Sequence, residues 1–398
     1  MHPNRSSESH AHLRTTRRAP LSLQVATRPD GALGTMSPVI LTAGRRREDA
    51  VDPAQSGFAR LSRQIKAEGL LDRFVGFYVR KAVFWAVVLV AAVAASVMLG
   101  DSWWQLVIAA VLGVVFTQFA FMAHEASHRQ IFRSGPVNDW AGLVLADLVV
   151  GISYSWWMNK HTRHHGNPNV IGRDPDIAKD TISFLEEDAA KSRGLVRLIT
   201  RKQGYLFFPL LLLEGLNLHV HGIRHVVDRR NNVKRRGLEL AFIGARLVGV
   251  TALVFWAFPP LLAAVFLFVQ LGVFGVYMGA SFAPNHKGMP LIPRGVRVDF
   301  LERQVLTSRN IRGGRLMDSL MGGLNYQIEH HLFPSMARPA LKRTQQIVRE
   351  YCRENDIRYT ETGLIESYGI VIAYLNRVGL AARDPFDCPM IQGYRRRD

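Results

Sequence analysis

Four long apolar stretches constrain the fold of this chain more than any other feature. Each is close to the ~20 residues that an α-helix needs to cross ~30 Å of hydrocarbon. The four stretches cover residues 82–99, 104–123, 238–257 and 261–282. Short turns at 100–102 and 259–260 join them in pairs. The sequence therefore predicts an all-α integral membrane protein, with about four transmembrane helices in two hairpins and a cytoplasmic helical cap.

The distribution of positive charge predicts the orientation of these helices. The chain has a formal net charge of +18, yet both short turns are poor in Lys and Arg. The basic residues that flank the apolar stretches are Arg80, Lys81, Arg129, Arg133, Lys234, Arg235 and Arg236. Because cytoplasmic loops carry an excess of positive charge, we expect the termini and the large intervening segments to be cytoplasmic. The excess of basic residues beside the membrane explains the positive net charge, so we expect no nucleic-acid partner.

Composition divides the chain into three parts. Residues 1–57 are rich in Arg, Ser, Ala and Pro and have no apolar core, which predicts a disordered basic leader rather than a secretory signal. A transit peptide, or translation from Met36, would also explain this leader. Residues 58–383 are predicted to form the membrane domain with its cytoplasmic cap, and residues 384–398 a C-terminal tail.

Three further stretches carry apolar residues without clearly spanning a membrane. Helical spacing across 58–77 is typical of an amphipathic helix on the membrane surface. The stretches 140–158 and 205–218 contain Asp147 and Glu214, which favour half-buried amphipathic helices over full crossings.

Histidines gather beside the apolar stretches. Of the fourteen histidines, eight fall in four groups. The groups are His124 and His128; His161, His164 and His165; His286; and His330 and His331. Spacings of three and four residues place imidazoles on one side of a helix, as metal ligation requires. An isolated HxxxH pair could equally be two unrelated polar residues.

The sequence leaves open which histidine supplies the eighth imidazole of this set. His286 follows the fourth apolar stretch and could be a ligand or a lone interfacial histidine. His219, His221 or His225 could supply the eighth imidazole instead, although solvent or acidic headgroups would explain them as well.

The number of imidazoles points to two metal ions. Eight exceed what a single ion binds, and imidazole suits Zn, Cu, Fe and Ni alike. Only Cys352 and Cys388 are present, without CxxC spacing, so a thiolate site is not indicated. A site between hydrophobic helices favours an apolar substrate, and breaking an unactivated C–H bond favours a redox metal that activates O2.

Three motifs resemble those of the membrane fatty acid desaturases. They are HEASH at 124–128, HTRHH at 161–165 and QIEHH at 327–331. The resemblance extends from about Phe58 to about Gly379. Gln327 at the first position of the third motif resembles the front-end branch, which acts between an existing double bond and the carboxyl end. Many such enzymes carry a fused cytochrome b5 domain with an HPGG motif, which this sequence does not contain.

The resemblance implies a mechanism and a set of ligands. Two Fe ions would be held by His124, His128, His161, His164, His165, His330 and His331, with His286 as an eighth ligand. Gln327 would contact the metal through water at best. With O2 and two electrons, the enzyme would remove two hydrogens from adjacent methylenes of a fatty acyl chain, linked to CoA or lipid. The electrons would come from a separate ferredoxin, or from cytochrome b5 with its reductase. Tyr154, Trp156 and Trp157 are candidates for lining the acyl tunnel.

Two other functions fit the same residues. A hydroxylase or oxygenase of the same superfamily would share the ligands and differ in substrate placement. A non-enzymatic membrane metal-binding or transport protein would instead place ionisable residues along a path at mid-membrane depth. Because the histidines lie at one interface, we predict an enzyme, a fatty acid desaturase.

Overall fold

A computed structural model describes residues 56–382 of the chain. Nearly all of the predicted leader and the whole tail at 384–398 lie outside the described residues. Within the described part, the protein is built from helices, with only two strands of two residues each. The all-α prediction is confirmed.

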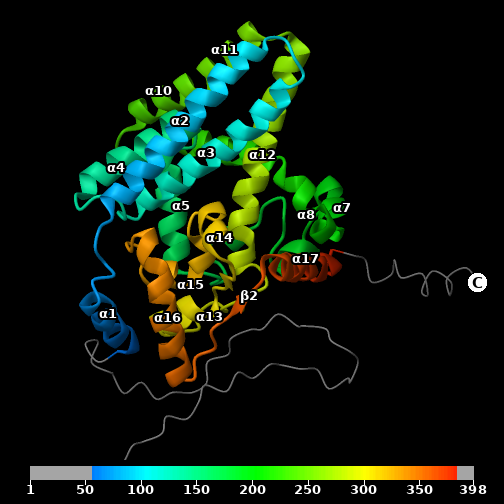
Figure 1. The fold of residues 1–398 in the computed structure, drawn as a ribbon. Helices are drawn as coiled ribbons and strands as arrows, with labels where there is room; N and C mark the ends of the chain where they lie inside the picture. Colours follow the sequence, from blue (N-terminus) through cyan, green and yellow to red (C-terminus); the bar gives the residue numbers. More distant parts are fainter. Residues whose placement is uncertain (1–55, 383–398) are drawn as a thin grey trace, which may run out of the picture.

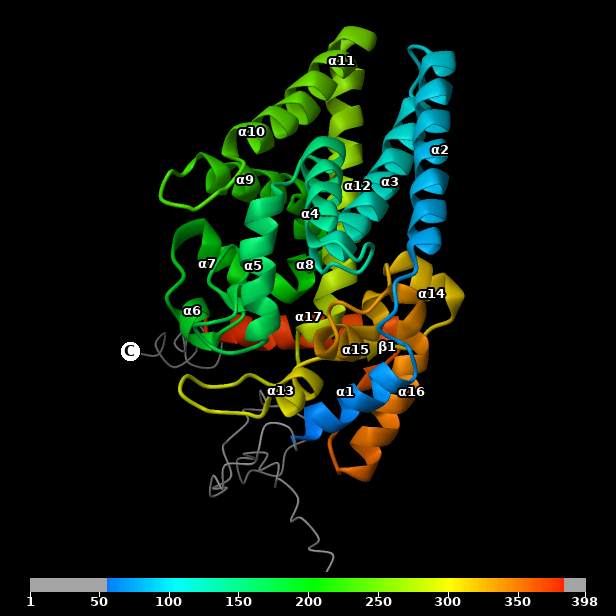
Figure 2. The same cartoon turned by 90° about the vertical axis from the view of Figure 1, so that its left-hand side faces the viewer.

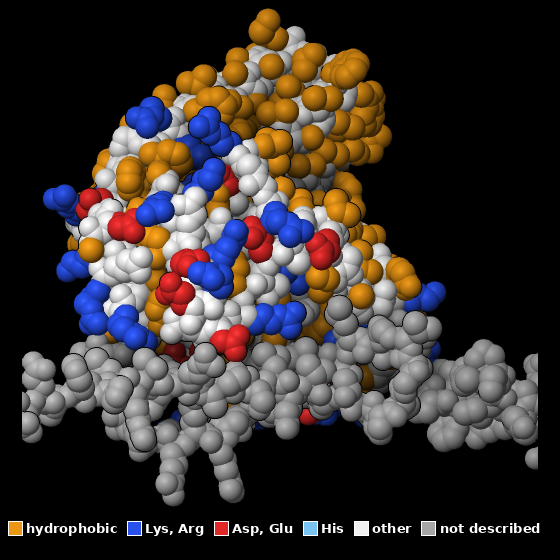
Figure 3. Space-filling view, turned by 60° about the horizontal axis from the view of Figure 1, so that its bottom comes forward, with side chains coloured by type: hydrophobic (Ala, Val, Ile, Leu, Met, Phe, Trp, Pro, Cys, Tyr) orange, Lys and Arg blue, Asp and Glu red, His pale blue; other side chains and the backbone are white. Residues whose placement is uncertain are grey.

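Four helices in the described residues are long and apolar enough to cross a membrane. They are α2 (Val75–Leu99), α3 (Gln105–Ser127), the composite of α10 (Arg236–Gly244), η4 (Ala245–Gly249) and α11 (Val250–Ala257), and α12 (Pro260–His286). They project together from one end of the molecule (Figures 1 and 2). Hydrophobic side chains gather over this projection, whereas charged side chains gather over the rest (Figure 3). Helices are thus present at all four predicted crossings, with bounds that differ by up to seven residues.

The turn between α2 and α3 is closed by a buried glutamine. The last carbonyl groups of a helix have no partner within the helix. Gln105 donates from its side-chain nitrogen to the carbonyls of Ser96 (2.7 Å) and Gly100 (2.9 Å). Gly100 adopts a positive φ of 55°, which favours glycine at this bend. The hairpin therefore satisfies its own backbone at the apolar end of the molecule.

The two ambiguous stretches form sharply bent helix pairs. The first contains α4 (Gly135–Leu143), the π-helix η2 (Val144–Val150) and α5 (Tyr154–Gly166), with a bend of 116°. The second contains α8 (Gln203–Leu211) and α9 (Glu214–Val227), with a bend of 75°. Neither pair is a straight crossing.

Arg246, which lies inside the third span, supports the first bend. Its Nε donates to the carbonyl of Val149 at 2.8 Å, and its guanidinium lies 4.2 Å from the centre of the Phe116 ring. A π-helix leaves carbonyl groups without their usual partner, and this arginine binds one of them. The charge of Arg246 is therefore used inside the protein.

The remaining elements form a cap below the spans (Figure 2). Its helices are α1 (Gly57–Ala67), η3 (Pro175–Ile177), α6 (Glu186–Ala190), α7 (Gly194–Arg201), α13 (Phe300–Leu306), α14 (Arg315–Leu320), η5 (Leu324–Tyr326), α15 (Gln327–Leu332), α16 (Arg338–Glu354) and α17 (Leu364–Leu380). Strands β1 (Asn310–Ile311) and β2 (Glu361–Thr362) pair in parallel.

The amphipathic helix predicted across 58–77 is wrong in extent and in place. The structure divides this stretch between α1 and the start of α2. The apolar face of α1 buries Leu61 and Ile65 in a core with residues of α13, α15 and α16. Amphipathic spacing cannot distinguish a protein core from a lipid surface, because both accept the same apolar face.

A buried ion pair joins the spans to the cap. Glu125 on α3 accepts a hydrogen bond of 2.6 Å from Arg338, the first residue of α16, and both side chains are almost fully buried. The backbone nitrogen of Arg338 also donates to the hydroxyl of Tyr78 on α2. Three segments that are far apart in the sequence therefore meet at this pair.

Replacing Arg338 with Met should destabilise the protein, because it leaves Glu125 charged and buried without a partner. We expect a loss of about 3–5 kcal/mol in the free energy of unfolding in detergent. The double variant Glu125→Gln, Arg338→Met should recover much of this loss. Breaking the exposed pair of Arg343 and Glu68 with Arg343→Met should cost less than about 1 kcal/mol. Equal losses for the two single variants would contradict this assignment.

Candidate metal centre

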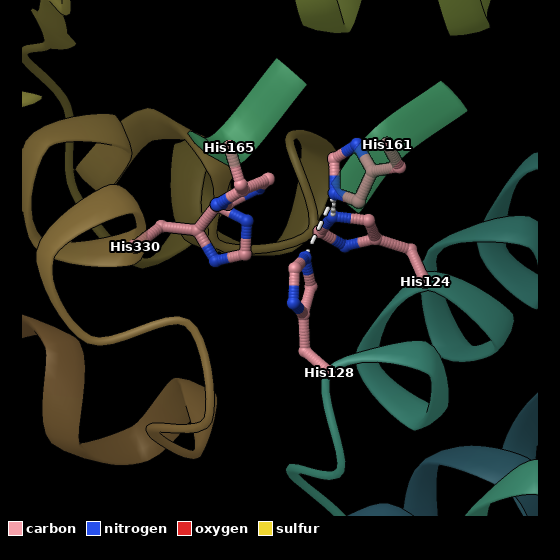
Figure 4. Close-up of side chains that lie close together, drawn as sticks. All are labelled: His124, His128, His161, His165 and His330. Carbon is pink, nitrogen blue, oxygen red and sulfur yellow. Dashed lines mark hydrogen bonds between the residues drawn. The ribbon is translucent and has the colours of Figure 1, made fainter. Parts of the chain in front are cut away.

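The eight predicted histidines lie in two groups at the junction of the spans and the cap. The first group combines five imidazoles, each with one ring nitrogen within 4.8 Å of the others. These are His124, His128, His161, His165 and His330 (Figure 4). The second group contains His164, His286 and His331. Four segments of the chain, separated by up to about two hundred residues, supply them.

Local helix geometry delivers each side chain of the first group. His124 lies in the last turn of α3, and His128 follows at its C-cap. His161 lies opposite on α5, with its Nε2 at 2.9 Å from that of His124 and 2.8 Å from that of His128. Because His161 and His165 are four residues apart, one face of α5 carries both. His330 on the short helix α15 completes the group.

The second group forms on the other side of α5. The Nε2 atom of His286, at the end of α12, lies 3.4 Å from that of His164 and 3.1 Å from that of His331. The rings of His165 and His331 stack at 4.1 Å between centroids, so the two groups are in contact. Thus α5 contributes to both groups through its three histidines, and His286 is the eighth member of the set.

The other three candidates for the eighth imidazole lie outside both groups. His219 is buried, with Nδ1 at 2.5 Å from the Gly215 carbonyl. His221 is partly exposed beside Asp180 and stacks on Trp156. The structure places neither these nor His225 with the eight clustered histidines.

Hydrogen bonds orient the imidazoles of the second group. The Nδ1 atom of His164 donates to Asp174 (2.9 Å), that of His286 to the Thr307 carbonyl (3.0 Å) and that of His331 to the Gln304 side chain (3.0 Å). With each Nδ1 proton so engaged, each Nε2 carries the lone pair that faces the group. The sequence did not single out Gln304 or Thr307, because neither belongs to a histidine motif.

Gln327 lies closer to the histidines than the resemblance implied. Its side-chain amide nitrogen is 2.9 Å from Nε2 of His286, and its amide oxygen accepts a hydrogen bond from Asn285. The side-chain amide of Gln327 therefore contacts the second group directly.

Burial sets the charge state of the two imidazoles of the third motif, whereas the carboxylates of Asp174 and Asp176 raise the pKa of His164 despite its burial. Burial is the main cause that lowers the pKa of His330 and His331 far below the usual value, and neighbouring imidazoles lower it further. Both ring nitrogens of His165 and Nε2 of His330 are buried without a hydrogen-bond partner. Neutral, converging imidazole nitrogens without partners are the donor set that a borderline transition metal binds. The residues present thus fit a pair of metal ions.

Asp174 and Asp176 approach His164 closely enough to form a third potential group. Asp174 already accepts hydrogen bonds from His164 and from two backbone nitrogens, and Asp176 is paired with Lys160 at 2.9 Å. These carboxylates therefore hold His164 and the loop that follows α5 in place.

A buried carboxyl group supports the third histidine motif from behind. Glu329 accepts hydrogen bonds from Tyr359 (2.8 Å) and from the side chain of Asn310 (2.7 Å). Burial raises the pKa of Glu329 to about 7, although these hydrogen bonds oppose the shift. The motif is thereby fixed to β1 and to the segment before β2.

An apolar cavity opens beside the first group. Its lining is His124 together with Ala120, Ala123, Ala146, Val150, Ile152, Tyr154, Trp157, Met278 and Phe282. Of the three aromatic residues predicted to line an acyl tunnel, Tyr154 and Trp157 contact this cavity. Trp156 lies elsewhere, stacked on His221.

Comparison with known proteins agrees with this geometry. A family model described as fatty acid desaturase matches residues 101–363. A Delta(6)-fatty-acid desaturase of Caenorhabditis elegans is 28% identical over 336 residues, which cover 81% of this chain and 74% of the relative. A Delta(8)-fatty-acid desaturase of Arabidopsis thaliana is 28% identical over 365 residues, which cover 85% and 78%. A Delta 8-(E)-sphingolipid desaturase of Kluyveromyces lactis is 27% identical over 312 residues, which cover 72% and 53%.

The chain belongs to the fatty acid desaturase family. It is an integral membrane protein and an oxidoreductase of lipid metabolism. The resemblance seen in the three histidine motifs is confirmed.

Replacing Gln304 with Leu should weaken metal binding without touching a ligand. The change removes the acceptor for Nδ1 of His331, and such supporting bonds are worth about tenfold to a hundredfold in metal affinity. We expect faster loss of bound metal under chelator challenge, followed by elemental analysis. Gln304→Glu keeps an acceptor at this position and serves as the matched control. If the Leu variant retained metal as the wild type does, Gln304 would have no role in orienting His331.

Proposed function

We propose that this protein desaturates a long-chain fatty acyl group in an O2-dependent reaction at a di-iron centre held by its eight clustered histidines. The observation that carries the proposal is the placement of the first imidazole group, through His124, beside an apolar cavity, with the second group in contact with the first. His124 belongs to the first group and also lines that cavity, so methylenes that entered it would lie beside the metal site. The cavity has a volume of about 30 Å³, so a long acyl chain would have to widen it.

The proposed ligands divide between two irons. His124, His128, His161, His165 and His330 would hold the first, and His164, His286 and His331 the second, with Gln327 beside it. Iron bound there would supply the oxidising power to break two C–H bonds of adjacent methylenes. In the balanced reaction, the acyl chain loses two hydrogen atoms, a separate donor gives two electrons, solvent gives two protons, and O2 is reduced to two waters.

The chain's own residues would position the ligands and exclude water. Asp174, Gln304 and the Thr307 carbonyl would keep the second group in one tautomer. The apolar side chains of the cavity would keep solvent away from the reacting methylenes and hold them at a fixed distance from His124. The position of the new double bond would then follow from how far the acyl chain enters.

Two features favour a front-end enzyme with its site on the cytoplasmic side. The relatives include desaturases named for positions 5, 6 and 8, and Gln327 stands first in the third motif. The cap carries the charged side chains, which matches the cytoplasmic excess of positive charge.

The acyl group would arrive linked to CoA or lipid, and the electrons would come from a ferredoxin or from cytochrome b5 with its reductase.

Fatty-acid profiling tests the proposed reaction. Cells that express the wild-type chain and are fed saturated and monounsaturated acids should form a new double bond, detected by gas chromatography with mass spectrometry. The variant His330→Ala, His331→Ala should form none, since one ligand is lost from each group. His221→Ala removes a histidine outside both groups and should keep wild-type activity. A hydroxylated product in place of a double bond would identify a hydroxylase of the same superfamily.

Filling the apolar cavity should impair turnover without removing metal. Ala146→Leu adds three carbon atoms to the cavity wall and leaves the eight clustered histidines unchanged. A change of one methylene in an apolar pocket is worth about tenfold to two-hundredfold in specificity. We therefore expect at least about a tenfold loss of product from long acyl substrates, with unchanged iron content. Loss of iron together with activity, or unchanged activity, would show that this cavity does not hold the acyl chain.

A further inference from the structure

Three arginines come together on the cap, and we call them the arginine surface: Arg173, Arg294 and Arg303. Arg173 lies in the loop after α5, Arg294 in the loop after α12, and Arg303 on α13. The two loops are joined by a bridge between Val170 and Ile292. The guanidinium of Arg294 packs so closely on Gly172 that a Cβ there would lie 2.6 Å from its Nε. Burial is the main cause that lowers the pKa of Arg303; nearby Asp299 opposes this shift, and nearby Arg173 adds to it.

Arg303 lies beside the carboxylate of Asp299, whereas the other two residues of the arginine surface carry positive charge without such a neighbour in the described chain. Arg173 and Arg294 are exposed, and neither forms an ion pair with a residue in the range 56–382. The arginines of α16 differ, because Arg343, Arg349 and Arg353 each pair with a glutamate. Exposed like charges without ion-pair partners, as at Arg173 and Arg294, favour the approach of an acidic partner surface.

Helix α13, which carries Arg303, also contacts the second histidine group. Gln304, the neighbour of Arg303 on α13, accepts from His331 and donates to the carbonyl of His165. One turn further on, the carbonyl of Thr307 accepts from His286. Helix α13 and its C-cap therefore carry Arg303 as well as the groups that contact His331 and His286. In Figure 2, α13 lies at the end of the molecule opposite the projecting spans.

We propose that the arginine surface is the docking site for the acidic face of a small soluble electron-transfer protein. The inference rests on the proposed function, which requires two electrons from outside the chain. Two reduced donor molecules would dock in turn, each losing one electron to an iron beneath α13. These two electrons, with the two removed from the acyl chain, complete the reduction of O2 to two waters.

Charge reversal on the arginine surface tests the proposal. Purified iron-loaded wild-type protein and the variant Arg173→Glu, Arg294→Glu are mixed with reduced ferredoxin or with reduced soluble cytochrome b5. Donor oxidation is followed by stopped-flow absorbance. At low salt, we expect the second-order rate constant of the variant to be lower by about tenfold or more. The difference should disappear at high salt, where the charges are screened.

Two control variants isolate the effect of charge at this place. Arg173→Lys, Arg294→Lys keeps the charge and should retain the wild-type rate. Arg353→Glu reverses an exposed arginine on α16 and should leave the rate unchanged. Equal rates for wild type and the reversed variant, an equal loss with Arg353→Glu, or a difference that persists at high salt would overturn the proposal. So would a wild-type protein that dithionite reduces but neither donor does.

Dithionite separates this proposal from the proposed function. It is small and reduces iron without docking, so product formed after dithionite and O2 tests the desaturase reaction alone. No product from the wild type would defeat the proposed function. Product from both proteins with dithionite, together with equal donor rates, would defeat the docking surface only.

Discussion

The burial of eight imidazoles at one place is the constraint on which the rest of this structure depends. An imidazole removed from water needs a partner for each ring nitrogen. In the second group, Asp174, Thr307 and Gln304 satisfy the Nδ1 atoms, and the Nε2 atoms then face each other at 3.1–3.4 Å around His286. Lone pairs held so close together are unfavourable unless a cation binds between them. The geometry therefore supports the proposed role of these histidines as a ligand set.

Such a set requires four helices to keep their relative positions, and the apolar spans provide that rigidity. Helices α3 and α12 pack along much of their length and end at the site with His124 and His286. Gly113 permits their close approach, since a Cβ there would lie 2.8 Å from the side chain of Val273. The pair of Glu125 and Arg338 then fixes the first histidine motif to the segment that follows the third. Membrane anchoring and site assembly thus use the same helices.

Much of this arrangement could be predicted from the sequence. Apolar length predicts the four spans because crossing hydrocarbon imposes a minimum length on a helix. Helical spacing predicts that His161 and His165 share a face, and the family comparison confirms the resemblance of the motifs. The ligand roles of the eight histidines stay a prediction, although the structure brings all eight together. The choice of His286 over His219, His221 and His225 required the fold, since sequence position alone left these alternatives open.

What could not be predicted depends on contacts between distant segments. Gln304 is a single glutamine in a short polar helix, and only the packing of α13 against α5 and α15 gives it a role. The amphipathic pattern of α1 predicts a membrane surface as readily as the protein core in which Leu61 and Ile65 lie. The arginine surface likewise forms only when two loops, about 120 residues apart, pair at Val170 and Ile292.

Anomalous X-ray diffraction at the iron absorption edge, from crystals of purified full-length protein, tests the central claim most directly. The account predicts two anomalous peaks, one among His124, His128, His161, His165 and His330 and the other among His164, His286 and His331. Two peaks at these places would establish the ligand division proposed for the two irons. A single peak, peaks away from both groups, or a signal only at the zinc edge would contradict it.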